Sequence, residues 1–561
     1  MVMNLQIAYQ LIVALVLLTS ISIRAEETNS IDQTATISSD TPRRNVQCVF
    51  VRPQGASSVP ATCIAVHEQT GRVLSFCKGV SRCVLGTPGL PIINGIRIWS
   101  PDSTRQSPVY PIGLPAQVVF PLLPRLATNR KGPWLTDVTS SSVVIRWETD
   151  VPARSVIHIA TPPGPAVRSV PRWVGGSAKC DDSGKNCVHS VRVTGLATNS
   201  RYSFLIGDVK PALRPAPGLS IGQHPAGSIV TAPTAGDFSF SVLGDVQAQT
   251  SYHWTVWKDV SAFSAALQIN MGRNGGPVFH TGDMTQKFGE SEAETRKRWS
   301  EFFANGSLLL KDNPFYPAIG NNDDSSSFKK YFGTEGPAAP ATYYSVDYGR
   351  THFVVLAEPG EPGLGSCGSS PSSQVQWLRN DLANASARLD IDNIIVIAHH
   401  GPRGYGGYYG HNMELLACLE SMFMDDSGPT DFFKKLRLVL SGHHHYYQRI
   451  EHEHIVSGLR RKVQYVTVGT AGAVHRCPDN SPEVKMMSPI CPDADGTNDY
   501  QSVVVRVRGP MIELRTYNFA YDKVTGQKVS RGPRNKWYSM IDCVAFDANG
   551  DEIQDQATCQ E

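Results

Sequence analysis

The stretch LVLSGHHHYYQR, residues 438–449, places three consecutive histidines directly after an apolar run. Such a run is typical of a buried strand, so the histidines stand where that strand would reach the surface. The triplet is either a solvated loop or part of a metal site, because neutral imidazole is a common metal ligand. In an extended turn alternate side chains point the same way, so His443 and His445 can face a metal that His444 does not.

Four further apolar runs end in side chains of metal-binding types. The runs are FSFSVL (238–243), PVFHT (277–281), PFYPAI (314–319) and NIIVIA (393–398), and they lead to Asp245, Asp283, Asn321 and His399. Helix-like stretches such as ESEAETRKRWSEFF and SQVQWLRNDLANASARL separate the runs. This alternation predicts an α/β layered domain with ligands gathered at strand ends. Carboxylate, amide oxygen and imidazole together form a mixed donor set that suits a pair of divalent or trivalent metals.

The order of these motifs resembles that of the purple acid phosphatases, a family within the metallophosphoesterases. In this chain the motifs read LGDVQ, TGDMTQ, GNND, VIAH and GHHH, and the resemblance covers roughly residues 236–520. It implies an αββα catalytic domain with two metal ions, each Fe, Zn or Mn. The ligands that it implies are Asp283 as the bridge, Asp245 and His445 on one metal, and Asn321, His399 and His443 on the other.

The function implied by the resemblance is a secreted acid phosphatase that hydrolyses phosphate monoesters. Two cations would neutralise phosphate oxygens and lower the pKa of water, so that a metal-bound hydroxide attacks phosphorus. Two positions depart from the family pattern: Gln286 stands where a tyrosine binds ferric iron, and Asn322 stands where a histidine acts on the substrate. An amide can hydrogen-bond to phosphate but cannot supply a proton, and losing a general acid lowers a rate by roughly 10²–10⁴-fold.

A substitute proton donor is expected in the segment GYYGHNME, where His411 matches a substrate-facing histidine of the family. His400 and His253 are weaker candidates. Arg403, in the glycine-rich GPRGYGGYYGH, is expected to help bind phosphate together with Asn322 and His411, although a loop without ligand contacts would explain it as well.

Other functions stay open at this point. Without the usual acid, a phosphodiesterase or nucleotide pyrophosphatase is an alternative, because a good leaving group needs less protonation. A metal-binding protein with weak or no catalysis is a second alternative. The sequence GLSIG (218–222) matches a serine-nucleophile elbow, but a proline-rich linker precedes it where a strand is required.

The remaining regions suggest a multidomain chain. Leu196 and Tyr202 resemble the tyrosine corner of fibronectin type III domains, with Trp147 as the core tryptophan. The expected parts are a signal peptide (1–25), a disordered segment (26–45), a cysteine-containing β domain (46–127), a fibronectin type III-like β-sandwich (128–235), the catalytic domain (236–520) and a C-terminal tail (521–561).

Composition limits the partners. The 52 Lys and Arg residues nearly balance the 50 Asp and Glu residues, so no nucleic-acid binding is expected. The apolar stretch near the start is shorter than the ~20 residues that span a bilayer, so it predicts a signal rather than an anchor. Twelve cysteines and the sequons at Asn305 and Asn384 agree with a secreted or lumenal glycoprotein containing disulfides. The expected partner is a small phosphorylated substrate. The long N-terminal β region could also support a homodimer.

Overall fold

The structure is a computed structural model of the whole chain. Before residue 127 it describes the strands β1–β7. Beyond that point it describes residues up to 553, with gaps at 161–171, 183, 207–208, 211–225, 249, 271–275, 287–290, 334–341, 358–366, 368–370, 406–411, 426–427, 475–480, 489–496, 523–524 and 531–536. Among the described residues, no helix combines the length and the apolar character needed to cross a bilayer.

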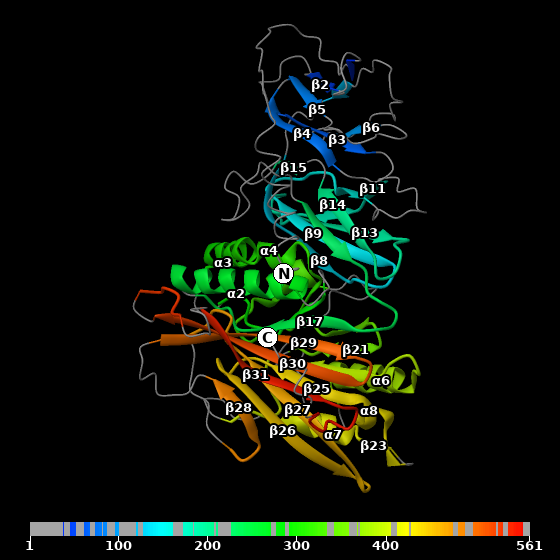
Figure 1. Cartoon of the computed structure of the whole chain (residues 1–561), viewed down its shortest axis with the longest axis vertical. Helices are drawn as coiled ribbons and strands as arrows, with labels where there is room; N and C mark the ends of the chain where they lie inside the picture. The colour runs from blue at the N-terminus through cyan, green and yellow to red at the C-terminus, as the bar shows by residue number, and fades with distance from the viewer. Residues whose placement is uncertain are drawn as a thin grey trace, which may run out of the picture. The chain divides into compact units, whose positions relative to one another are not determined.

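Two mixed β-sheets form the centre of the region after residue 236 (Figure 1). The first has the order β19 (Phe315–Pro317), β18 (Val278–His280), β17 (Phe238–Leu243), β29 (Thr497–Arg508), β30 (Met511–Asp522) and β31 (Tyr538–Phe546). The second has the order β20 (Tyr344–Tyr348), β21 (Thr351–Val355), β22 (Asn393–Ile397), β25 (Leu436–Ser441), β27 (Leu459–Val468), β26 (Tyr447–Val456) and β28 (Val484–Ser488). The predicted apolar runs are parallel strands: β17, β18 and β19 in the first sheet, and β22 and β25 in the second.

The sheets pack face to face and helices cover their outer faces. Phe240 of the first sheet contacts Phe353 of the second in the core between them. The helices α2 (Ser251–Asn270), α3 (Glu292–Asn305), α4 (Ser307–Leu310) and α5 (Ser325–Phe332) share a core with the first sheet, and α6 (Ser373–Ala387), α7 (Met413–Ser421) and α8 (Asp431–Lys435) share one with the second. The result is the predicted αββα layering.

The two predicted helices begin at serine caps. The Ser291 hydroxyl accepts the N–H of Glu294 ahead of α3, and the Ser372 hydroxyl accepts the N–H of Val375 ahead of α6. Each cap satisfies an N–H that has no partner inside the helix and contributes about 1 kcal/mol.

Residues 127–230 form two antiparallel sheets. One contains β12 (Ser177–Lys179), β13 (Cys187–Thr194), β9 (Ser142–Thr149) and β8 (Ala127–Thr136), and the other contains β10 (Val156–Ala160), β14 (Arg201–Ile206) and β16 (Ala226–Val230). The Tyr202 hydroxyl accepts the N–H of Ala197 at 2.7 Å, and the buried Trp147 stacks on His189. Tyr202 thus has the backbone contact expected of it, and Trp147 is buried as expected.

The N-terminal region contains the expected short strands. Cys48 of β2 (Asn45–Val51) lies opposite Cys83 of β5 (Arg82–Gly86), and Cys63 of β3 (Ala61–His67) lies opposite Cys77 of β4 (Val73–Val80). The segment expected to be disordered contains β1 (Ile37–Ser38), which pairs with β2. Apart from Asn45 at the start of β2, the rest of that segment lies outside the described residues, as does the expected signal peptide.

The C-terminal boundary needs a correction. We expected a separate tail after residue 520, but β30 crosses that boundary and β31 continues the sheet, with Phe546 opposite Ile512. Val544 and Phe546 are buried in the core between the sheets. Burial of this face, rather than a disulfide alone, holds the segment in place.

Candidate metal centre

The candidate ligands lie on loops at the carboxyl edges of the two sheets. The loops follow β17, β18 and β19 of the first sheet and β22 and β25 of the second, and they carry Asp245, Asp283, Asn321, His399, His443 and His445. Since strands within each set run parallel, their carboxyl ends gather at one edge. The face-to-face packing then brings residues that are 200 positions apart into one site.

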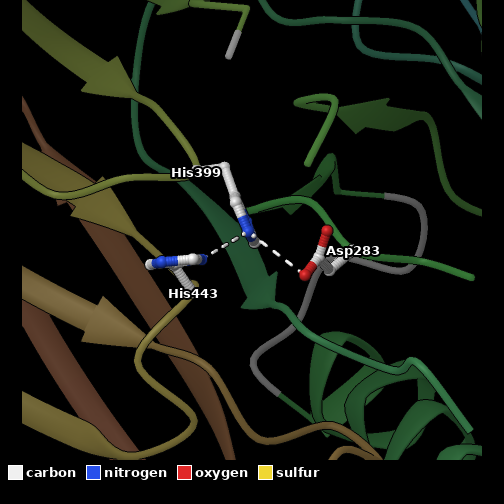
Figure 2. A group of neighbouring side chains, drawn as sticks. All are labelled: Asp283, His399 and His443. Atoms are coloured by element: carbon white, nitrogen blue, oxygen red, sulfur yellow. Dashed lines mark hydrogen bonds and ion pairs between the residues drawn. The ribbon is translucent and has the colours of Figure 1, made fainter. Parts of the chain in front are cut away.

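One group of candidate ligands contains Asp283, His399 and His443. Their donor atoms all lie within 4.8 Å of one another, and all three residues are buried. Figure 2 shows His399 between the other two, with Nε2 3.3 Å from Asp283 Oδ2 and 3.2 Å from His443 Nδ1. Asn321 joins this group, because its side-chain oxygen lies 3.1 Å from His399 Nε2.

The second group contains Asp245, Asp283 and His445, again with donor atoms within 4.8 Å and all three residues buried. His445 Nε2 lies 3.6 Å from Asp245 Oδ1. Asp283 therefore belongs to both groups.

Backbone carbonyls orient two of the imidazoles. His399 Nδ1 lies 2.7 Å from Thr281 O, and His445 Nδ1 lies 2.8 Å from Val474 O. A carbonyl only accepts, so each Nδ1 carries the proton and each Nε2 presents a lone pair to its group. Such outer contacts fix the tautomer of a metal-binding histidine.

Four of the candidate ligands adopt a left-handed backbone conformation. The φ angles are 53° at Asp245, 56° at Asp283, 67° at His443 and 47° at His445. This region is uncommon for residues with a side chain and clusters at functional sites. Gly320 meets a related constraint, because a Cβ there would lie 2.2 Å from Asp283 Oδ1. The loops thus adopt unfavourable backbone conformations that bring the candidate ligands together.

Burial sets the electrostatics of the centre. It raises the pKa of Asp245, and the neighbouring Asp283 adds to this effect. It lowers the pKa of His443, so that ring is neutral, the form that binds a metal. Burial opposes the charge of Asp283 as well, but the neighbouring His399 and the hydrogen bonds from Asn322 hold the pKa of Asp283 below its ordinary value. Two buried carboxylates beside three imidazoles form a donor set that fits cations.

Side-chain amides surround the bridging carboxylate. Asn322 donates to Asp283 through its backbone N–H and its Nδ2, each at 2.7 Å. The Nε2 of Gln247 also donates to Asp283 and lies 3.1 Å from His445 Nε2. Gln286 donates to the Asn322 oxygen at 3.1 Å, so it contacts Asn322 rather than any member of the two groups.

Comparison with known proteins agrees with this geometry. Residues 238–447 match the family model of the calcineurin-like phosphoesterases. The chain contains a calcineurin-like phosphoesterase domain. This family of metallophosphoesterases binds divalent metals, and the two Asp/His groups lie within or at the ends of the matched range.

Two uncharacterized proteins of Mycobacterium tuberculosis, MT2654 of strain CDC 1551 and Rv2577 of strain H37Rv, are 25% identical over 175 residues. Each match covers 27% of this chain and 31% of the relative, so it spans less than a third of those proteins.

Among solved structures, GAP50, the anchor in the inner membrane complex of Plasmodium, is 14% identical over 55% of this chain and 89% of its own, with a TM-score of 0.33. Vps29 of Entamoeba histolytica is 13% identical over 55% of this chain and its whole length, with a TM-score of 0.20. A two-domain fibronectin type III segment of chicken tenascin is 16% identical over 36% of this chain and its whole length, with a TM-score of 0.12. At these scores the likenesses carry no argument about the chain.

The other predicted residues of the phosphoesterase domain lie in varied places. His444 is buried, stacks on Tyr446 and belongs to neither group. The ring of His400 lies 3.7 Å from that of His443, beside the centre. His253 is on α2 outside both groups, and His411 lies outside the described residues.

Arg403 has partners away from the two groups. It lies 2.9 Å from His452 Nε2 and 3.5 Å from Glu483, and its guanidinium packs over the ring of Tyr465. The side chain is 14% exposed, so the expected phosphate contact would require it to leave these partners.

Sequence reasoning missed two residues of the centre. Gln247 and Asp323 are part of the motifs LGDVQ and GNND, but no role was predicted for either residue. The signal for Gln247 was its position two residues after Asp245, on the same strand-end loop. Asp323 accepts backbone N–H groups behind the ligands, and such a role leaves no distinct pattern in one sequence.

Proposed function

We propose that the protein is a metal-dependent phosphatase with two metal ions that hydrolyses phosphate monoesters. The observation that carries this proposal is the sharing of Asp283 by two groups of buried donors at the edge of a calcineurin-like phosphoesterase domain. Iron, zinc and manganese all accept carboxylate, amide and imidazole ligands, so each is a candidate for either position.

Bound cations would neutralise charge on a phosphoryl group and lower the pKa of water. The chain itself supplies the arrangement. Asp283 fixes the separation of the two groups, His399 and His445 present fixed lone pairs, and Asn322 brings an amide to the same edge. His400, whose ring lies 3.7 Å from that of His443, is our candidate proton donor among the described residues.

A second candidate is hydrolysis of phosphodiesters or pyrophosphates. The observation that favours it is the state of Asn322, whose amide is held by Asp283 on one side and Gln286 on the other. This side chain cannot protonate a leaving alkoxide, so substrates with good leaving groups would lose less rate.

We further propose that the protein is secreted and glycosylated, and that it acts on a small phosphorylated substrate. The disulfides Cys180–Cys187 and Cys367–Cys418 support an oxidising compartment. Asn384 of its sequon is exposed on α6, where a glycan can be accommodated.

The deciding experiment measures hydrolysis of p-nitrophenyl phosphate and bis(p-nitrophenyl) phosphate by chelator-stripped protein reloaded with iron, zinc or manganese. His445→Ala removes a candidate ligand. His454→Gln is the matched control, because His454 is buried but belongs to neither group and contacts Tyr465.

Monoester turnover that requires metal, disappears in His445→Ala and survives in His454→Gln would support the proposal. A preference for the diester would favour the second candidate. Full metal loading without turnover of either ester would overturn both and leave a metal-binding protein without catalysis.

A further inference from the structure

A single buried carboxylate ties together two loops of the metal centre. Asp323 is fully buried on the loop after β19. Its Oδ2 accepts the backbone N–H of Asp283 at 2.9 Å and that of Gly320 at 3.0 Å, and its Oδ1 accepts the N–H of Thr285 at 3.0 Å. Asp283 and Thr285 belong to the loop after β18, so Asp323 bridges the second and third motifs.

These hydrogen bonds act on the backbone of the shared ligand. Asp283 has a φ of 56°, a conformation that the surrounding structure must enforce. Its N–H donates to Asp323, while its carboxylate is the donor that the two ligand groups share. The contact from Asp323 therefore bears directly on where the Asp283 carboxylate lies.

The same loop is joined to Asp283 from the other direction. Asn322, adjacent to Asp323, donates its backbone N–H to Asp283 Oδ1. Asp283 thus donates its N–H to Asp323, and its carboxylate accepts the N–H of the preceding residue, Asn322. This reciprocal arrangement fixes the two loops relative to each other.

We propose that Asp323 is a positioning residue that sets the metal affinity of the centre by holding the Asp283 loop against the Asn321 loop. It contacts no member of the ligand groups through its side chain except by way of backbone N–H groups. The inference rests on one part of the proposed function, namely that the two groups bind metal.

A purely architectural role makes a different prediction. If Asp323 only stabilised the fold, replacing it would lower the unfolding temperature without changing metal affinity in the molecules that remain folded. The metal affinity of the folded molecules therefore separates the two roles. Outer contacts to ligands typically change metal affinity by about 10–100-fold when removed.

The test compares the full-length wild type with Asp323→Asn and the neighbouring Asp324→Asn. Asparagine keeps the shape of aspartate, but its NH₂ cannot accept an N–H, so at least one of the three bonds is lost. Asp324 is the matched control, since it is the next residue and its carboxylate accepts the N–H of Ser327 as the cap of α5. Metal-free proteins are titrated calorimetrically with MnCl₂, and their unfolding temperatures are measured in parallel.

We expect Mn²⁺ affinity to fall by about 10–100-fold in Asp323→Asn and to change less than threefold in Asp324→Asn. Unchanged affinity in a folded Asp323→Asn would overturn the inference while leaving the proposed function intact. Failure of the wild type to bind Mn²⁺, Zn²⁺ or iron would instead overturn the proposed function, and with it the inference.

A second measurement needs no variant. Hydrogen exchange of the metal-free wild type, followed by mass spectrometry, reports on the amides of Asp283, Thr285 and Gly320. If Asp323 holds them before metal binds, they exchange slowly, as buried hydrogen-bonded amides do. Rapid exchange at these positions in the folded protein would overturn the inference even if Asp323→Asn could not be purified.

Discussion

The backbone N–H of His443 donates to the carboxylate of Asp245, with the nitrogen 2.9 Å from Oδ1 and 3.1 Å from Oδ2. Asp245 follows β17 of the first sheet and His443 follows β25 of the second. The carboxylate therefore joins the two sheets at the metal centre. Because Asp245 is fully buried, its raised pKa marks a charge that is unfavourable without a nearby cation.

Asp245→Asn should weaken metal binding while sparing or raising the stability of the metal-free protein. The amide oxygen can still accept the His443 N–H without burying a charge. Loss of a ligand should lower metal affinity by more than the roughly 10–100-fold typical of outer contacts. Scanning calorimetry with and without Mn²⁺ measures both effects. A variant that binds Mn²⁺ like the wild type but unfolds at lower temperature would show that Asp245 is structural.

His352 should make stability depend on pH. It is buried between Asp347 at 2.7 Å and Asp381 at 2.8 Å. Burial opposes its charge, but hydrogen bonds to these two carboxylates raise the pKa of His352 to about 9 from the ordinary 6.5. Since the folded pKa exceeds the unfolded one, the stabilisation is complete below pH 6.5 and is lost as the pH rises through about 9.

We therefore expect His352→Gln to lower the free energy of unfolding by on the order of 2–3 kcal/mol at pH 6. The difference from the wild type should shrink between pH 6.5 and 9.5, as followed by urea unfolding at each pH. A difference that stays constant over this range would mean that His352 contributes through packing and not through its charge.

The metal centre was predictable because its ligands follow apolar runs. A buried strand must end at a sheet edge, so Asp245, Asp283 and His399 could be placed together without knowing any distance. The left-handed conformations that aim these side chains were not predictable. They depend on bonds such as that from His443 to Asp245, between residues 198 positions apart.

Long-range partners also decide what the local sequence leaves open. Arg403 lies in a glycine-rich stretch beside His399, which favoured a phosphate contact, but Glu483 and His452 come from distant segments. β31 lies within a stretch rich in polar residues, and its pairing with β30 decides its place. Local sequence carries no signal for either partner.

Arg403→Gln should affect the loop after β22 more than phosphate binding. The guanidinium is already held by Glu483, His452 and the ring of Tyr465. We expect a lower unfolding temperature and an inhibition constant for inorganic phosphate within about threefold of the wild type, since the guanidinium would need to leave these partners to reach the centre. A rise of tenfold or more in that constant would restore Arg403 as a substrate ligand.

The two antiparallel sheets of the region before residue 236 are joined to the phosphoesterase domain through Trp134. This residue of β8 is fully buried in the core on the helix-covered face of the first sheet, 4.5 Å from the ring of Phe303. Its Nε1 donates to Tyr331 O at 3.2 Å, on α5, the helix that begins just after Asp323 and Asp324. Strand β8 thus supports the segment that carries the third motif.

We expect Trp134→Ala to destabilise the protein by about 3–5 kcal/mol, as for other buried tryptophans. Trp377→Ala is the control, because Trp377 is only half-buried on α6 and packs against Tyr343, so its loss should be smaller. A fragment that starts at residue 236 lacks Trp134 and should bind Mn²⁺ more weakly than the full chain, as measured by calorimetry. A fragment that unfolds cooperatively at the temperature of the full chain and binds Mn²⁺ equally well would show that the sandwich is an independent module.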